Sequence, residues 1–91
     1  MWIRSQDKKK LVESTNVFIT FDNGTYIIKS FIEKYNYFDL GSYSTEEKAL
    51  SVLDKLERFA TDLERYIIEH DMFNDHTTRT VVDNIVFQMP E

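Results

Sequence analysis

The chain has 91 residues, no cysteine, and 16 acidic against 11 basic side chains, which gives a net charge of −5. Proteins bind nucleic acid nonspecifically by neutralising phosphates with basic side chains, so this charge argues against direct nucleic-acid binding. Hydrophobic residues make up 42% of the chain and aromatic residues 14%, a composition that can form a core. We therefore expect a single folded domain over residues 1–91.

The sequence carries no recognisable signal for export or membrane insertion. Its opening, MWIRSQDKKK, lacks the basic segment followed by an apolar segment that signal peptides have. No apolar run approaches the ~20 residues that span a bilayer. The absence of cysteine fits a reducing compartment. These features predict a soluble protein of the cytoplasm, with no membrane among its partners.

The first half of the chain predicts four strands. Apolar, β-branched and aromatic residues over 2–6, 16–21, 25–32 and 37–43 have the pattern of strands bounded by turns. Asn23-Gly24 is a strong hairpin signal, because both residues tolerate positive φ. The lysine-rich segment before Leu11 is expected to be a charged turn or a guarded sheet edge, rather than a basic contact patch.

The second half predicts one long helix and a last strand. From Thr45 to about His70 the apolar period becomes that of an amphipathic helix, with Ser44 as the expected N-cap and Glu47 completing a capping box. The run VVDNIVFQM predicts a strand that Pro90 closes. Strands, then a helix, then a strand predict an α+β fold: an antiparallel sheet of about five strands with one long amphipathic helix packed on one face.

The helix is too long for the sheet that it covers. It spans ~39 Å, whereas six-residue strands span only ~20 Å. Its apolar stripe continues into the overhang, and exposed apolar stripes usually find a partner. Alternatively, the helix breaks near residues 59–61, or residues 71–80 cover the stripe. The candidate partner-binding residues are Glu57, Asp62, Leu63, Glu64, Tyr66, Ile67 and Glu69.

The stretch EHDMFNDH contains both histidines of the chain. Imidazole and carboxylate groups bind zinc and similar ions, which makes His70, Asp75 and His76 weak candidates for a metal site. The histidines are six residues apart and point to different faces of a continuous helix, so they converge only if the chain turns at Asn74. Because no established ligand spacing is matched, we expect a helix end and a polar loop, without a metal.

Other sequence patterns do not indicate a binding or catalytic site. Tyr26, Tyr35, Tyr37 and Tyr43 could stack on single-stranded bases, but basic neighbours are few, so cross-strand packing is the preferred interpretation. The segments DNGTY and DLGSY each have a single glycine and match no phosphate-binding loop. No nucleophile–base pair emerges. We expect no enzymatic activity and no cofactor.

Three segments carry a resemblance to a known family. WIRSQDKKKL at the start, LGSYSTEEKALSVLDKL in the middle and VFQMPE at the end resemble a family of small uncharacterised proteins of Gram-positive bacteria, their phages and other mobile elements. These segments cover residues 2–11, 39–56 and 86–91, a little over a third of the chain. The opening motif is the most specific of the three.

The resemblance implies a setting more than an activity. Small acidic proteins of mobile elements often inhibit host defence, and they include anti-CRISPR proteins that bind type II RNA-guided nucleases. It therefore implies a non-enzymatic, protein-binding inhibitor acting in the bacterial host cytoplasm, with such a nuclease as the protein partner. The alternative is a homo-oligomeric accessory or structural protein, such as a homodimer, which self-associates through its long helix.

Overall fold

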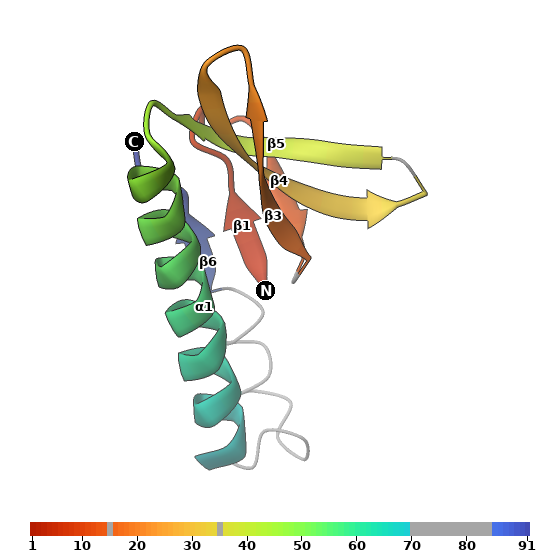
Figure 1. The fold of residues 1–91 in the computed structure, drawn as a ribbon. Coiled ribbons are helices and arrows are strands. Elements are labelled where there is room, and N and C mark those ends of the chain that lie inside the picture. The colour runs from red at the N-terminus through yellow and green to blue at the C-terminus, as the bar shows by residue number, and fades with distance from the viewer. Residues whose placement is uncertain (15, 35, 70–84) are drawn as a thin grey trace.

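The structure is a computed structural model that describes residues 1–14, 16–34, 36–69 and 85–91, without the side chains of 32 and 66–69. The described part of the chain forms six strands and one helix (Figure 1). This arrangement confirms the α+β class. The elements are β1 (Trp2–Arg4), β2 (Leu11–Glu13), β3 (Val17–Asp22), β4 (Thr25–Glu33), β5 (Asn36–Tyr43), α1 (Glu46–Glu69) and β6 (Val86–Gln88).

The prediction of one five-stranded antiparallel sheet is wrong, because the strands form two three-stranded sheets. Their orders are β2-β1-β6 and β3-β4-β5, and β6 runs parallel to β1. Parallel strands need a long connection, and β1 and β6 are connected by all the other strands and α1. No strand was predicted over residues 11–13, but Leu11–Glu13 pairs with β1 as a strand. The first strand also ends earlier than predicted, at Arg4.

The predicted hairpin at Asn23-Gly24 is confirmed. Asp22 pairs with Thr25, and the two residues between them have φ values of 51° and 77°. Two successive residues with positive φ form the turn that matches the twist of a hairpin. The turn therefore sets the register of the whole β3–β4 pair.

A bulge bends the β4–β5 pair. Ile28 pairs with Gly41 and Lys29 with Asp39, so Leu40 is an extra residue on β5. Bulges of this kind bend a strand and increase its twist. The far ends of β4 and β5 extend away from α1 in Figure 1. Phe38, which lies near those ends on β5, is exposed.

The tyrosines of the described strands pack against other aromatic rings or within the core. The ring centroid of Tyr37 lies 5.4 Å from that of Phe18 and 5.5 Å from that of Phe31. The ring centroids of Tyr26 and Phe21 are 4.9 Å apart. These contacts are the cross-strand packing that the sequence favours. Tyr43 is buried, and Tyr35 lies outside the described residues.

The core lies between α1 and both sheets. The apolar stripe of α1 contributes three buried side chains, and half-buried Leu53 packs against them. The stripe was predicted from three- and four-residue spacing, and its first half is confirmed. The buried apolar residues are Ile3, Val12, Ile28, Leu40, Tyr43, Ala49, Val52, Leu56 and Met89.

The N-cap of α1 lies one residue later than expected, at Thr45. Thr45 Oγ1 accepts a hydrogen bond of 3.1 Å from the N–H of Lys48, and the Thr45 carbonyl accepts the first helical bond, from Ala49. These are the bonds of an N-cap residue. The prediction of Ser44 as the cap, with a capping box to Glu47, is therefore wrong.

Helix α1 extends past the ends of the described strands, as the sequence predicts. It has 24 residues, and Leu56 is the last buried one among its side chains up to residue 65. The ring of Phe59 still contacts Phe87 of β6, at 5.3 Å. Beyond this contact the helix continues past both sheets (Figure 1). A break near residues 59–61 is excluded, whereas residues 71–80 lie outside the described part.

Candidate functional site

A groove runs along one side of α1, next to the start of β3. It is a hollow of about 360 Å³, and we call it the α1 groove. The residues that line it come from the N-terminus, from β3 and from the middle of α1. They are Met1, Val17, Leu53, Asp54, Leu56, Glu57, Ala60, Thr61 and Glu64.

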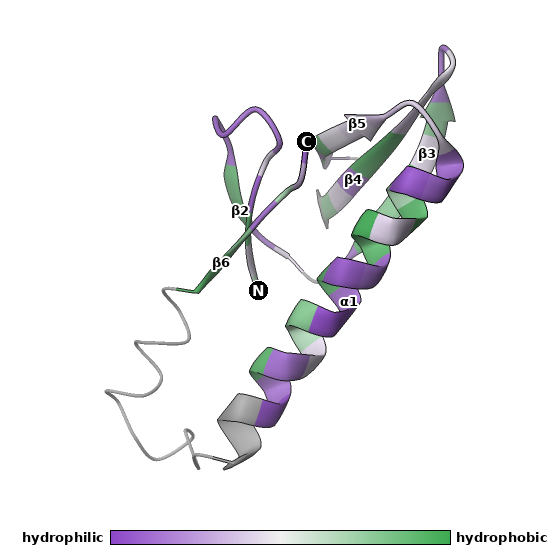
Figure 2. Ribbon diagram, turned by 90° about the vertical axis from the view of Figure 1, so that its left-hand side faces the viewer, coloured by the Kyte–Doolittle hydropathy of each residue, from purple (hydrophilic) through white to green (hydrophobic). Residues whose placement is uncertain are grey.

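Two adjacent stripes of α1 form the floor and one rim of the groove. Leu53, Leu56 and Ala60 are three and four residues apart, and they present apolar surface. A second stripe has the same spacing, is exposed, and is acidic at three of its four positions. It consists of Asp54, Glu57, Thr61 and Glu64. Apolar and polar segments alternate along the helix in Figure 2.

The opposite wall of the groove is fixed by backbone hydrogen bonds. The carbonyl of Met1 accepts from the N–H of Ser14 at 2.9 Å. The carbonyl of Asn16, next to Val17, accepts from the N–H of Phe31 at 2.9 Å. These bonds hold Met1 and Val17 across from α1, so the groove joins segments that are distant in the sequence.

The charged side chains that line the groove are all acidic. Its lining contains three carboxylates and no basic side chain. Asp54 and Glu57 also border a neighbouring hollow on α1, which Arg58 and Arg65 line together with Asp62. The arrangement can therefore accept an apolar side chain on the floor and basic groups at the rim.

The structure brings two of the seven predicted partner-binding residues into the groove. Glu57 and Glu64 line it, whereas Asp62 is exposed on the neighbouring surface and Leu63 is half-buried outside it. The remaining predictions are Tyr66, Ile67 and Glu69, which belong to the last turn of α1 but whose side chains lie outside the description.

Sequence reasoning did not predict the other seven residues of the groove as partner-binding residues. Asp54 lies three residues before Glu57, and this spacing could have revealed it as part of the acidic stripe. Met1 and Val17 carry no such signal, because only the tertiary fold brings them to α1.

The candidate metal ligands His70, Asp75 and His76 lie outside the described residues. Within the described ranges, no group of three or more His, Cys, Asp or Glu side chains is placed to hold a metal ion. The same part of the chain has no helix that is both long and apolar enough to cross a membrane.

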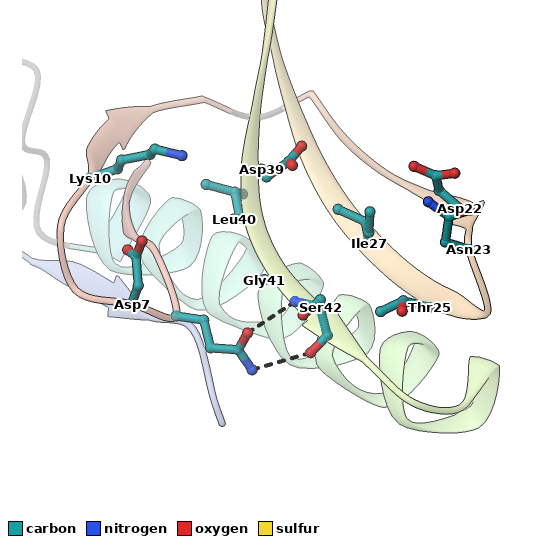
Figure 3. A pocket seen from close by; sticks show the side chains of 11 residues that line it. Asp7, Lys10, Asp22, Asn23, Thr25, Ile27, Asp39, Leu40, Gly41 and Ser42 are labelled. Carbon is teal, nitrogen blue, oxygen red and sulfur yellow. Dashed lines mark hydrogen bonds between the residues drawn. The ribbon is translucent and has the colours of Figure 1, made fainter.

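A second, larger hollow lies between the β1–β2 loop and the sheet β3-β4-β5 (Figure 3). Its volume is about 500 Å³, and several polar groups that line it already have partners. Asp7 accepts from the Ser5 hydroxyl and from the N–H of Lys9, and these bonds lower the pKa of its carboxyl below the ordinary value. Asp39 lies 3.6 Å from Lys29. This hollow is therefore a less suitable docking site than the α1 groove.

One side of this hollow is closed by a set of hydrogen bonds that we call the Gln6 clasp. It consists of Gln6, Ser42, Tyr43 and Pro90. Gln6 bonds both backbone groups of Ser42 and the carbonyl of Pro90, which also accepts from the Tyr43 hydroxyl at 2.8 Å. Figure 3 shows the two bonds between Gln6 and Ser42.

The clasp joins three segments that are far apart in the sequence. Gln6 comes from the opening segment, Ser42 and Tyr43 from the middle segment, and Pro90 from the last. Gly41 lies beneath them, and a Cβ there would be 3.0 Å from the Tyr43 hydroxyl and 3.4 Å from Gln6 Cβ. These hydrogen bonds hold the two terminal segments and β5 together.

No protein-family model matches the chain, no curated protein is similar to it, and no solved structure is similar to it. The functional proposal consequently depends on the α1 groove and on the chemistry of its lining.

Proposed function

We propose that the chain is a non-enzymatic, protein-binding inhibitor that docks on a basic protein surface through the α1 groove. The observation that carries the proposal is the pairing of an apolar floor with an acidic rim. Leu53, Leu56 and Ala60 supply the floor, and Asp54, Glu57 and Glu64 supply the carboxylates. Interfaces of this kind take affinity from a buried apolar centre and orientation from charges at the edge.

The dimensions of the groove limit the partner. A hollow of about 360 Å³ holds one or two large apolar side chains, not a whole helix. The partner is therefore a protein surface with one or two apolar anchors flanked by lysine or arginine. Arginine is the better match, since its guanidinium group pairs with a carboxylate through two hydrogen bonds.

The proposed target is a type II RNA-guided nuclease. The resemblance to small proteins of mobile elements supports this class of target. The channel that holds the guide–target duplex in such a nuclease is strongly basic, because it contacts nucleic-acid backbones. An acidic domain with an apolar anchor site can occupy part of that channel and exclude the nucleic acid.

A cleavage assay tests this function. Purified chain is added to guide-loaded nuclease before the DNA substrate, and the expected result is loss of cleavage near one equivalent. The variant Glu57→Lys/Glu64→Lys reverses two rim charges and should lose inhibition. Glu33→Lys/Glu91→Lys makes the same change in net charge at exposed positions outside the groove, and should inhibit normally.

Two results would contradict the proposal. One is full cleavage at a large excess of folded wild-type chain. The other is equal inhibition by the groove variant and by its control, because inhibition would then not depend on the rim carboxylates.

A further inference from the structure

The outer edge of β3 has unused backbone hydrogen-bonding groups. Asn16 bonds Phe31 of β4, and in an antiparallel pair every second residue faces the neighbouring strand. Val17, Ile19 and Phe21 therefore direct their N–H and C=O groups away from β4. Within the described residues, no strand pairs with this side and no hydrogen bond involves those six groups. In Figure 2, β3 lies at the edge of its sheet, on the side away from β5.

This edge lacks the usual protection against strand addition. Natural edge strands are blocked by lysine, proline, a bulge or an inward-pointing charge. The segment Val17–Phe21 has none of these, and its pairing with β4 is regular from Val17 to Asp22. Phe21 is 63% exposed, the highest value among the large apolar side chains described. An open, apolar edge of this kind is a template for a further strand.

We propose that β3 pairs antiparallel with β3 of a second copy of this chain, about a twofold axis that passes by Ile19. The sequence of the strand is self-complementary in this register. Ile19 then lies opposite Ile19 of the second copy, and Val17 lies opposite Phe21. These three positions are the ones with outward-facing backbone groups, so all six groups on each chain are satisfied.

Side-chain chemistry supports the same register. Phe21 covers the smaller Val17 of the second copy on the face that carries the core. Phe18 lies opposite Thr20 on the other face. At the ends of the pair Asp22 lies opposite Asn16, so no like charges meet. The two sheets become one continuous six-stranded sheet, with both copies of α1 on the same face.

Self-association through β3 differs from the helix-mediated dimer that the sequence suggested. It also differs from docking in the α1 groove in its response to salt. Each copy carries a charge of −5, so salt should strengthen the dimer by screening repulsion between copies. Salt should weaken docking of a basic partner. Because Val17 contributes to both surfaces, this opposite dependence separates the two interactions.

The test measures the mass of the particle and the exchange of its amides. Analytical ultracentrifugation from about 1 μM to about 1 mM should show a rise from 10.9 kDa to twice that mass, at lower concentration in higher salt. Amide exchange at Val17, Ile19 and Phe21 should slow over the same range. The amides of Phe18 and Thr20 face β4 and serve as internal references.

The matched variants are Phe21→Lys and Phe38→Lys. Both replace an exposed phenylalanine on a strand by the same charged residue, and only the first lies on β3. Phe21→Lys should weaken the dimer by about tenfold or more, the scale of losing a central interface side chain. Phe38→Lys should leave it unchanged. A monomer at all concentrations, unchanged exchange at the three edge amides, or equal effects of the two variants would overturn the proposal.

Discussion

Gln6 satisfies both backbone groups of Ser42, a residue 36 positions away in the chain. Its Nε2 donates to the Ser42 carbonyl at 3.4 Å, and its Oε1 accepts from the Ser42 N–H at 3.0 Å. The side-chain amide thus takes the place of a neighbouring strand along this part of β5. The same Nε2 also donates to the Pro90 carbonyl at 3.2 Å, which ties the C-terminal segment to both.

Replacing Gln6 by alanine should lower the free energy of unfolding by about 0.5–1.5 kcal/mol, because its bonds to Ser42 at an exposed site and to Pro90 at a partly buried site are lost. Gln6→Glu should also be destabilising, since a carboxylate can still accept from the Ser42 N–H but cannot donate to the carbonyls of Ser42 and Pro90. Urea unfolding of each variant measures the change. Lys9→Ala, at an exposed position of the same loop, should cost less than about 0.5 kcal/mol. A Gln6→Ala protein as stable as the wild type would show that the clasp is not structural.

The two glycines should respond to alanine for different reasons. At Gly41 the added methyl group would lie 3.0 Å from the Tyr43 hydroxyl, and we expect a loss of about 1–3 kcal/mol from overpacking. Adding Tyr43→Phe removes that oxygen and should recover part of the loss, a non-additive result that a double-mutant cycle detects. At Gly24 nothing lies within 4 Å, so Gly24→Ala should cost about 1 kcal/mol from its φ of 77° alone. If the effects of Gly41→Ala and Tyr43→Phe on the free energy of unfolding were strictly additive, the predicted contact between the added methyl group and the Tyr43 hydroxyl would be contradicted.

Tyr43 should make the protein less stable in alkali. Burial raises the pKa of its phenol above the ordinary value of 10.0. The contribution of the neutral Tyr43 phenol to the free energy of unfolding is fully present below the pKa that this group has in the unfolded chain. It is lost as the pH rises towards the higher pKa of the folded protein. Tyr43→Phe should therefore flatten the fall in stability above about pH 10, although it removes a hydrogen bond to Pro90 at neutral pH. Urea midpoints of both proteins across this range measure the difference, and parallel curves would refute the prediction.

Substitutions of Ser44 and Thr45 test which of the two residues is the N-cap of α1. Thr45→Ala removes the oxygen that accepts from Lys48 and should cost about 1 kcal/mol. Ser44→Ala should change stability by less than about 0.5 kcal/mol, because Ser44 is exposed and precedes the cap. Thermal unfolding distinguishes the two. The opposite ranking would restore Ser44 as the cap.

Local signals were sufficient to predict the hairpin at Asn23-Gly24 and the amphipathic stripe of α1, because turn chemistry and apolar spacing act over a few residues. The cap was misplaced by one residue, since Ser44 and Thr45 are both good cap residues and only geometry chooses between them. The parallel pairing of β6 with β1 was missed because it joins the two ends of the chain.

The candidate site likewise has one part that could be predicted from the sequence and one part that depends on the tertiary fold. The acidic stripe of α1 was partly visible from sequence, through Glu57 and Glu64. The wall opposite was not, because Met1 and Val17 reach α1 only through backbone bonds of the folded protein. The clasp was also hidden: Gln6, Ser42 and Pro90 belong to three separate segments whose proximity no local pattern indicates.

The most direct test of the central claim is the affinity of the chain for a purified type II RNA-guided nuclease, measured by calorimetry at about 0.05 M and about 0.3 M salt. We predict a one-to-one complex that weakens with salt and that Glu57→Lys/Glu64→Lys weakens about tenfold or more, while Glu33→Lys/Glu91→Lys does not. No binding at low salt would contradict the proposed target. Binding that is insensitive both to salt and to the groove variant would contradict the α1 groove as the binding site.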